Sequence, residues 1–295
     1  MKKYLGIDIG GTNVKYALID ESGKISENTK VETSHNKDDF LNNLDQVVEK
    51  YQDTIQGIAF CAPGKITETT IHYGGSLPFL DGIDLGRRYQ HLDIPIVGIN
   101  DGKASVLAEN WLGSLKGLKN CAALTLGTGV GGGIIIDGKL VIGENSQAGE
   151  ASMLILNTEK NGMDSFAGAQ GSAVAMISKV NEALGNDDKT DGLAAFKAIN
   201  ANNEKAVKIF NQYCKNVAAI IINIQGLLDV KRVALGGGIS VQPKLIDQVK
   251  QEYAKIIAGN IFMRDTLTPI EIVAAKFRNE ANIYGALYNL LQKLN

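Results

Sequence analysis

The sequence is poor in the features that mark a protein as exported, membrane-spanning or nucleic-acid-binding. Its apolar N-terminal run, MKKYLGIDIGG, is too short for a signal peptide and contains Asp8, and no run reaches the length of a membrane span. The formal net charge of -2 gives no indication of a nucleic-acid or membrane partner. We therefore expect a cytoplasmic protein.

Cysteine and histidine are also scarce, with three of each in 295 residues. Cys61, Cys121 and Cys214 are scattered and odd in number. Each lies in an apolar strand-like or helical run, which favours buried free thiols over disulfides. The histidines all precede residue 100 and lack the spacing of metal ligands.

The chain does contain enough apolar material for a large core, since 44% of its residues are hydrophobic. Apolar patterning predicts a mixed α/β chain in two blocks. Each block opens with a strand, a glycine-rich turn, a strand, a polar turn and a strand, which predicts a duplicated α/β unit. Strands are predicted at 3–9, 14–20, 25–32, 55–61, 95–99, 121–126, 133–136, 139–142, 230–235 and 271–275, and helices at 40–51, about 170–183, 204–228, 243–257 and from about 280.

A polar, glycine-punctuated segment, WLGSLKGLKN, lies between the two blocks at 111–120. Such a segment is typical of a boundary between domains. We therefore expect a small N-terminal lobe over 1–115 and a large C-terminal lobe over 116–279.

Gly127, Gly129 and Gly132 spell the GxGxxG pattern of dinucleotide-binding loops. That fingerprint must open a helix, because the pyrophosphate binds at the helix N-terminus. Here the glycines lead into β-branched residues and an Asp137-Gly138 hairpin signal, so the sequence predicts a second strand and no dinucleotide. The loop either holds another phosphate through its backbone N–H groups or is an ordinary tight turn.

Asp8 stands in the apolar strand YLGIDIG, directly before Gly10 and Gly11. A carboxylate there needs a cation or several hydrogen-bond donors, because burying an unpaired charge is costly. Beside a phosphate loop the natural cation is Mg²⁺, which prefers one or two carboxylates together with phosphate oxygens and water. The alternative is a carboxylate that caps backbone N–H groups of the turn.

Four motifs in order resemble the ROK family of sugar kinases and repressors: DIGGT (8–12) followed by Lys15, LGTGVGGG (126–133), AGE (148–150) and LGGGIS (235–240). The resemblance runs over nearly the whole chain. It implies an α/β protein with the two-lobed actin-like ATPase fold, made of duplicated ribonuclease-H-like domains. It also implies that the C-terminal helix, 280–295, packs back on the first lobe.

The resemblance implies that ATP and Mg²⁺ are bound, with the Mg²⁺ held near Asp8 through water. The first two glycine motifs would face the phosphates and the last would lie by the nucleoside, although the last is equally explained as a packing turn between a strand and a helix. The residues implied for ATP are Asp8, Gly10, Gly11, Thr12, Lys15, Thr128, Gly129, Gly131, Gly236, Gly237 and Gly238.

Asp101 matches the catalytic base of the family, which accepts the proton of the attacking sugar hydroxyl. It follows a predicted strand and precedes a helical run, so a helix N-cap is the structural alternative. Asn100 and Glu150 are similar to residues that hydrogen-bond sugar hydroxyls, although Glu150 could simply start a helix. Gly75 and Met153 complete the implied sugar-binding set.

The chain departs from the family after AGE. Many ROK kinases continue into a Gly-His pair and a zinc-binding cysteine cluster, whereas this chain has Ser152-Met153 and no cysteine between Cys121 and Cys214. No zinc site is therefore expected. Because that histidine contacts the sugar near its anomeric hydroxyl, its loss favours a sugar that carries a group at C1. Phe79 is either an apolar wall of this pocket or a core residue under a loop.

We therefore expect 6-phosphorylation of a β-glucoside such as cellobiose, with N-acetylmannosamine kinase and glucokinase as alternatives. A ROK repressor would carry a helix-turn-helix domain before the first glycine loop, and this loop begins at residue 8. A non-catalytic sugar or nucleotide sensor is the remaining alternative of another class. Homodimers are common among the relatives, so a homodimer stays an open alternative, and the sequence itself does not show the oligomeric state.

Overall fold

The computed structural model describes residues 1–75 and 77–294, leaving aside the side chain of residue 279. The chain divides into two compact units. Unit 1 comprises Met1–Gly117, Leu140–Ala148 and Asn279–Asn295, and unit 2 comprises Leu118–Lys139 and Gly149–Arg278. The sequence places the boundary at 115/116 and assigns 140–148 to the second lobe, whereas the structure assigns that segment to unit 1.

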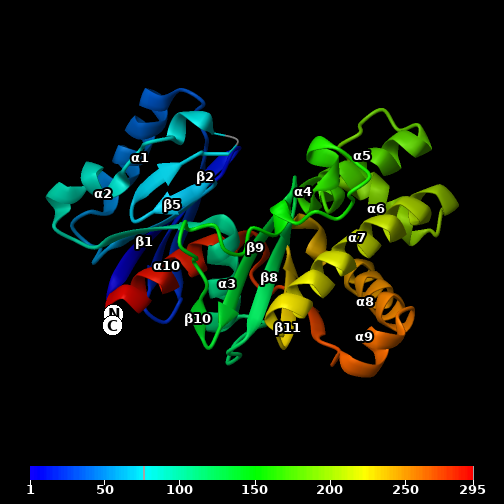
Figure 1. The fold of residues 1–295 in the computed structure, drawn as a ribbon. Coiled ribbons are helices and arrows are strands. Elements are labelled where there is room, and N and C mark those ends of the chain that lie inside the picture. The colour runs from blue at the N-terminus through cyan, green and yellow to red at the C-terminus, as the bar shows by residue number, and fades with distance from the viewer. Residues whose placement is uncertain (76, 295) are drawn as a thin grey trace. The chain divides into compact units, whose positions relative to one another are not determined.

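Unit 1 is built on a five-stranded sheet with the strand order β3-β2-β1-β4-β7 (Figure 1). The first three strands form an antiparallel meander, and β1, β4 and β7 are parallel. The strands are β1 (Lys3–Ile9), β2 (Asn13–Asp20), β3 (Ile25–Glu32), β4 (Ile58–Ala62) and β7 (Ile96–Asn100).

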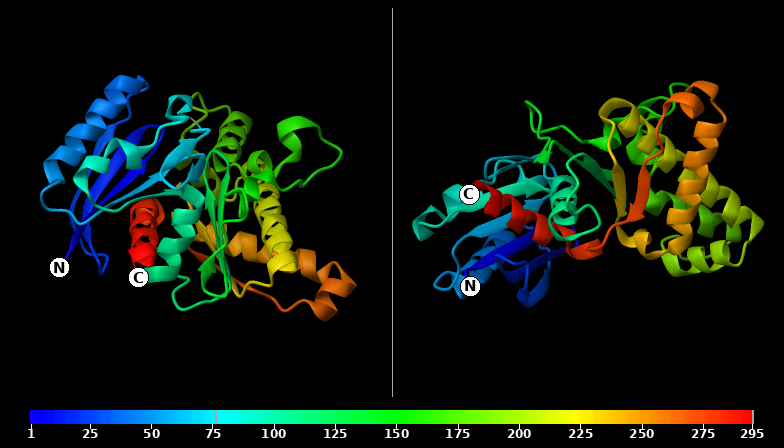
Figure 2. Two further views of the ribbon diagram at one scale, coloured as in Figure 1. Left: turned by 60° about the vertical axis from the view of Figure 1, so that its left-hand side comes forward. Right: turned by 90° about the horizontal axis from the view of Figure 1, so that it is seen from below.

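Helix α1 covers one face of this sheet, and α3 and α10 cover the other. Alternate residues of β1 show this division, since Leu5 shares an apolar core with Phe40 of α1, whereas Gly6 lies against Ile283 of α10. Helices α3 and α10 run side by side, with α10 in red in Figure 2. The bounds are α1 (Lys37–Tyr51), α2 (Leu85–Arg88), α3 (Asp101–Leu112) and α10 (Ala281–Leu294), with a small hairpin of β5 (Lys65–Thr67) and β6 (Thr70–His72).

Unit 2 repeats the same topology. Its sheet has the order β10-β9-β8-β11-β12, with β8 and β9 antiparallel and β8, β11 and β12 parallel. The predicted duplication is therefore confirmed. The strands are β8 (Cys121–Leu126), β9 (Val130–Ile136), β10 (Lys139–Leu140), β11 (Arg232–Gly236) and β12 (Glu271–Ala274). The second residue of β10, Leu140, begins the segment that is counted with unit 1.

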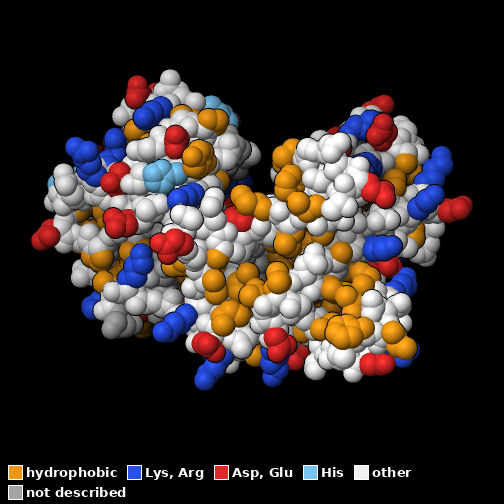
Figure 3. All heavy atoms as spheres, in the orientation of Figure 1, with side chains coloured by type: hydrophobic (Ala, Val, Ile, Leu, Met, Phe, Trp, Pro, Cys, Tyr) orange, Lys and Arg blue, Asp and Glu red, His pale blue; other side chains and the backbone are white. Residues whose placement is uncertain are grey.

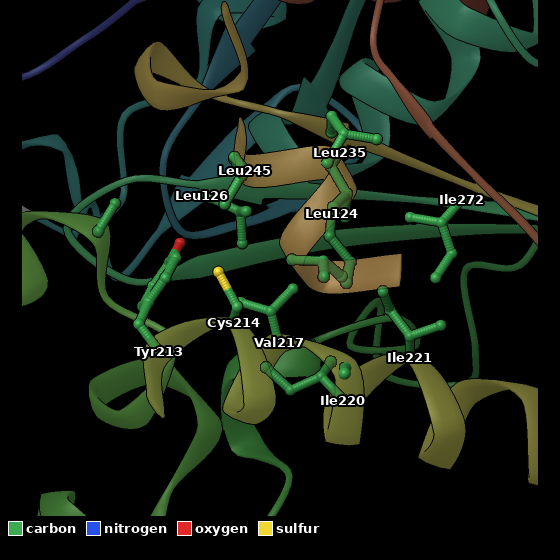
Figure 4. Close-up of a cluster of buried hydrophobic side chains, with 14 of the residues drawn as sticks. Leu124, Leu126, Tyr213, Cys214, Val217, Ile220, Ile221, Leu235, Leu245 and Ile272 are labelled. Carbon is green, nitrogen blue, oxygen red and sulfur yellow. The ribbon is translucent and has the colours of Figure 1, made fainter. Parts of the chain in front are cut away.

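The core of unit 2 lies between its sheet and α7. Val217, Ile220 and Ile221 of α7 pack beneath Leu124 of β8 and Leu235 of β11 (Figure 4). The helices are α4 (Ala167–Gln170), α5 (Ala173–Leu184), α6 (Gly192–Asn200), α7 (Glu204–Leu228), α8 (Pro243–Ala258) and α9 (Ile261–Thr266). The 3-10 turns of the two units are η1 (Pro78–Leu80), η2 (Gln90–Leu92), η3 (Ala151–Met153), η4 (Gly162–Ser165), η5 (Gly238–Val241) and η6 (Arg278–Glu280).

The three cysteines are buried free thiols, as the sequence predicts. Among the described residues, no helix combines the length and apolarity that a membrane crossing requires. Hydrophobic side chains gather over α9 in Figure 3, where Ile261 and Phe262 are exposed. A neighbouring groove of about 540 Å³, lined by α8, α9 and β12, contains none of the site residues that the sequence predicts.

The contact between α3 and α10 has no room for a side chain at Gly285, because a Cβ there would overlap the carbonyl group of Ala104. We expect Gly285→Ala to lower the free energy of unfolding by about 3 kcal/mol, the upper end of the usual cost of overpacking. Gly226→Ala on α7 is the matched control, because its Cβ would meet nothing within 4 Å. Because alanine is more favourable than glycine inside a helix, the Gly226→Ala variant should be about 0.5–1 kcal/mol more stable than the parent. Denaturant unfolding measures both, and a Gly285→Ala protein as stable as Gly226→Ala would contradict this account of the packing.

Candidate active site

The first glycine loop joins β1 to β2 in unit 1. The N–H of Gly10 donates to the carbonyl oxygen of Asn13 at 3.1 Å, which closes the turn. A Cβ on Gly10 would lie 2.9 Å from that same oxygen, so the turn has little room for a side chain. Gly11 and Thr12 form the tip of the loop.

Thr33, at the end of β3, holds this loop from one side. Its hydroxyl donates to the carbonyl oxygen of Gly10 at 2.7 Å, its N–H donates to that of Thr12 at 3.0 Å, and the residue is only 4% exposed. All described peptide bonds are trans, so the N–H of Gly11 points away from the Gly10 carbonyl. The carbonyl of Gly10 is thus turned towards Thr33, and the neighbouring N–H points to the opposite side, where it can donate to an anion.

Asp8 is buried at 6% exposure and is paired on both oxygens. Its Oδ2 lies 3.3 Å from Nζ of Lys15, its cross-strand partner on β2, and its Oδ1 accepts a hydrogen bond of 2.9 Å from Nδ2 of Asn282 on α10. The predicted need for a cation or several donors is thus met by an ammonium group and an amide. No bond to the backbone of the turn is among the contacts of Asp8 in the described part of the chain.

Asp8 and Asp101 lie at the same edge of the unit 1 sheet. Cys61 on β4 pairs with Asp8 in the strand register. Burial raises the pKa of the Cys61 thiol, and the negative charges of Asp8 and Asp101 raise that pKa further. Both carboxylates are therefore close enough to influence the same buried thiol.

Asn100, not Asp101, is the N-cap of α3. Its Oδ1 accepts hydrogen bonds from the N–H of Gly102 at 2.9 Å and of Lys103 at 3.4 Å, while its Nδ2 donates to the carbonyl of Gly64 at 2.8 Å. Asp101 is the first residue of the helix and is exposed. Its Oδ1 accepts a second hydrogen bond from the N–H of Gly102, at 2.7 Å. The sequence offers the N-cap of this helix as an alternative role for Asp101, and in the structure Asn100 has that role.

Gly64 and Gly75 both adopt the left-handed backbone conformation, with φ of 88° and 60°. A Cβ on Gly64 would overlap the carbonyl oxygens of His72, at the end of β6, and of Tyr73, so this contact requires glycine. Gly75 is exposed in the segment that follows β6. Phe79 is partly buried and packs edge-on against Phe40 of α1 at 5.3 Å between ring centroids, which favours its interpretation as a residue packed on the core under a loop.

The second glycine loop joins β8 to β9 in unit 2, so the predicted strand after the glycines is confirmed. The carbonyl oxygen of Gly127 accepts hydrogen bonds from the N–H groups of Ala173 and Val174, in the first turn of α5. Thr128 is exposed at the tip, followed by Gly129. A Cβ on Gly127 would meet nothing within 4 Å, and its φ is not positive. Neither packing nor backbone conformation accounts for this glycine.

Strand β9 begins at Val130, earlier than predicted, and includes Gly131 and Gly132. A Cβ on Gly132 would overlap the carbonyl oxygen of Gly149. The AGE segment therefore lies directly against this strand, and small residues in the strand make the close approach possible.

The third glycine run follows β11. Gly236 pairs with Thr125 of β8, so both runs of unit 2 lie at the carboxyl ends of adjacent parallel strands, the usual ligand edge of such sheets. Gly237 has a φ of 92°, and a Cβ there would overlap the carbonyl of Leu126, as the packing-turn interpretation requires. Gly238 is different, because a Cβ on it would meet nothing within 4 Å.

Glu150 precedes η3, a short 3-10 segment of three residues, and its side chain caps no helix N–H group. Met153, the last residue of that turn, is 58% exposed. The following segment is held by the backbone, through a bridge between Ile155 and Phe166 and a hydrogen bond from Leu156 to Ser165. In the described part of the chain, no group of three or more histidine, cysteine or acidic side chains could hold a metal ion.

Thr33 and Asn282 contact the first glycine loop and Asp8, and the sequence analysis does not single out either residue. Thr33 could have been found, because the predicted hairpin of 14–20 and 25–32 places residue 33 opposite Thr12 when its register is extended. Asn282 has no such local signal, since it lies 274 residues from Asp8.

Known proteins resemble the chain over its whole length. The model of the ROK family matches residues 4–293. The β-glucoside kinase of Listeria monocytogenes is 27% identical over 301 residues, covering 99% of each chain, and the glucokinase of Halalkalibacterium halodurans is 28% identical over 323 residues, covering 99% of this chain and 96% of the relative. A ROK family protein of Streptococcus pneumoniae, solved in complex with sucrose, superposes with a TM-score of 0.90 at 28% identity and 99% coverage of both chains. This similarity confirms the predicted actin-like α/β fold.

The support of the first glycine loop by Thr33 can be tested by Thr33→Val. Loss of the hydroxyl leaves the Gly10 carbonyl without its 2.7 Å partner and able to turn towards a bound anion. We expect ATP to bind about tenfold more weakly by calorimetry, consistent with one lost hydrogen bond to a buried group.

Thr54→Val is the control, because the Thr54 hydroxyl makes a similar bond of 2.9 Å to the carbonyl of Tyr51 at the end of α1. This variant should bind ATP as the parent does. Equal ATP affinity in both variants would show that Thr33 has no effect on the loop.

Proposed function

The chain belongs to the ROK family over nearly its whole length, and on this premise we propose that it is an ATP-dependent sugar kinase acting on a β-glucoside. The observation that carries the proposal is the placement of Asp101. The helix that begins there already has its N-cap in Asn100, so helix capping alone does not account for a carboxylate at this exposed position. A carboxylate at the edge of the sheet, near Asp8 and the first glycine loop, suits a general base.

In the proposed reaction, Asp101 accepts the proton of a sugar hydroxyl, the 6-OH in the simplest case. The hydroxyl oxygen forms a bond to the γ-phosphorus, and the bond from that phosphorus to the β–γ bridging oxygen breaks. ADP leaves with the electron pair of the broken bond. Positioning and charge neutralisation supply most of the rate in such transfers.

The glycine loops are proposed to supply the phosphate contacts. Gly11 and Thr12 in unit 1, and Thr128 and Gly129 in unit 2, present backbone N–H groups or small side chains at the loop tips. Gly10 and Gly131, next to these tips, have no Cβ to keep an anion away. Such groups let an anion approach the backbone closely. Gly238 is proposed to lie by the nucleoside together with its neighbours Gly236 and Gly237, because a Cβ on Gly238 would meet nothing within 4 Å.

Mg²⁺ is proposed as the accompanying cation. Asp8 fits an ion held through water better than one bound directly, because each carboxylate oxygen already accepts from Lys15 or Asn282. When bound, the ion would neutralise charge on the phosphate oxygens. The Lys15 ammonium group, 3.3 Å from Oδ2 of Asp8, is proposed to add positive charge on the phosphate side of the first loop.

The sugar is proposed to be a β-glucoside because of the exposed Met153. A thioether offers an adaptable apolar surface and no hydrogen bond to an anomeric hydroxyl. The similarity to a β-glucoside kinase and to a protein solved with sucrose supports a sugar with a group at C1. The glucokinase is equally similar in sequence, so identity alone does not choose the sugar. Asn100, Gly75 and Glu150 are proposed to contact the sugar hydroxyls, Asn100 through the amide hydrogen that does not bond Gly64.

The kinase assignment is tested with a panel of glucose, cellobiose, an aryl β-glucoside, N-acetylmannosamine and N-acetylglucosamine, followed by ADP release. We expect the β-glucosides to be the best substrates. Asp101→Asn should lower kcat by about 10²–10⁴-fold with little change in sugar KM, because a general base acts in the transition state. Asp53→Asn, at another exposed carboxylate of unit 1, is the matched control and should retain full activity. Turnover retained in Asp101→Asn would refute the assignment, and inactivity of the parent on all sugars would favour the sensor.

The role of Met153 in sugar choice is tested by Met153→His. A donor at this position should improve kcat/KM for free glucose by about tenfold and reduce it for the aryl β-glucoside, because hydrogen bonding to a hydroxyl discriminates against its replacement. The ratio of the two kcat/KM values is the measurement. An unchanged ratio would remove Met153 from the sugar site.

A further inference from the structure

We propose that Asn282, on the C-terminal helix α10, is a positioning residue that holds the Asp8 carboxylate in the orientation needed for binding Mg²⁺-ATP. The inference rests on the proposed function, since it assigns Asp8 to the phosphate side of that reaction. Its basis is the 2.9 Å hydrogen bond from Nδ2 of Asn282 to Oδ1 of Asp8. This bond joins the first strand of the chain to its last helix.

Lys15 and Asn282, the two partners of Asp8, contribute in different ways. Lys15 supplies charge, but its Nζ lies 3.3 Å from Oδ2, longer than the 2.7–2.9 Å typical of a charge-assisted hydrogen bond. Its side chain is 32% exposed and ends on a flexible stem, so it fixes direction poorly. Asn282 donates at normal hydrogen-bond length from a short side chain with two rotatable bonds. The amide is therefore the group that determines how the carboxylate is turned.

Close packing of α10 against the sheet and α3 fixes the position of Asn282. Its neighbour Ile283 packs over Gly6, where a Cβ would lie 2.8 Å from the Ile283 side chain, and Gly6 lies on the same face of β1 as Asp8. Gly285 brings the helix into contact with the Ala104 carbonyl of α3. Two glycines thus allow the close approach that places the amide beside the carboxylate.

The same helix provides a matched control. Asn289, two turns further along α10, donates from its Nδ2 to the carbonyl oxygen of Gly98 on β7 at 3.3 Å. Both asparagines anchor α10 to the sheet through the same chemical group. Only Asn282 has a side chain of the candidate active site as its acceptor, so only its removal should affect the ligand.

The experiment is a double-mutant cycle read by calorimetric ATP binding, with Mg²⁺ and with the metal chelated. The variants are Asn282→Leu, which keeps similar volume without a donor, Asp8→Asn and their combination. We expect Asn282→Leu to reduce the gain in ATP affinity due to Mg²⁺ by about tenfold, the effect of a lost hydrogen bond to a charged group. In the Asp8→Asn background it should cause no further loss, because Asn282 acts through Asp8. Asn289→Leu should leave the gain unchanged, even where it lowers the melting temperature.

Two results would overturn the proposal. One is an equal loss of Mg²⁺-dependent affinity from Asn282→Leu with and without Asp8, which would mean that the two residues act independently. The other is the same loss from Asn289→Leu, which would mean that any weakening of α10 has this effect. Failure of the proposed function gives a different signature, namely no phosphorylation of any sugar by the unsubstituted protein, while the binding cycle still reports on Asn282.

Discussion

The burial of one carboxylate, Asp8, is the constraint on which unit 1 depends. A charged group at 6% exposure requires both a counter-charge and hydrogen-bond donors. The counter-charge comes from Lys15 across the β1–β2 pair, and a donor comes from Asn282. Because Asn282 lies on the last helix, completing unit 1 requires the chain's C-terminal segment to return to its first strand.

The glycines described above fall into three groups by their geometry. Gly6 and Gly285 allow close packing of α10, and Gly64 and Gly237 adopt backbone conformations that bring them against neighbouring carbonyls. Gly127 and Gly238 belong to neither group, since their missing Cβ atoms would point into open space with ordinary φ values. Close approach of a ligand to the backbone is the proposed reason for the last pair. Sequence motifs alone do not separate the three groups, whereas the geometry does.

Most of the fold is predictable from local pattern. The apolar stripe of α1, the limits of α7 and the two meanders follow directly from periodicity and turn residues, which are local properties. The short helices α6 and α9 and the hairpin β5–β6 were not predicted, because brief elements carry little periodic signal. The assignment of 140–148 to unit 1 depends on tertiary contacts that no local pattern encodes.

The residues of the candidate site also divide into those that the sequence predicts and those that only the structure shows. Asp8, Asp101 and the glycine runs stand out in the sequence because each combines an unusual residue with a strand end. The roles of Asn100 and Asp101 become distinct only in the structure, which identifies Asn100 as the helix cap. Thr33 and Asn282 act through contacts with the backbone or with another side chain. The extended register of the predicted hairpin points to Thr33, whereas the pairing of Asn282 with Asp8, 274 residues apart, leaves no trace in a single sequence.

The central claim is that this chain transfers a phosphoryl group from ATP to the 6-OH of a β-glucoside. The most direct measurement is ³¹P NMR of the protein incubated with ATP, Mg²⁺ and cellobiose, recorded with proton coupling. The account predicts loss of the γ-phosphate signal and growth of a phosphomonoester signal split by two protons, the pattern of a phosphate on a CH₂–O group. Growth of inorganic phosphate alone, or an unchanged ATP spectrum, would contradict it.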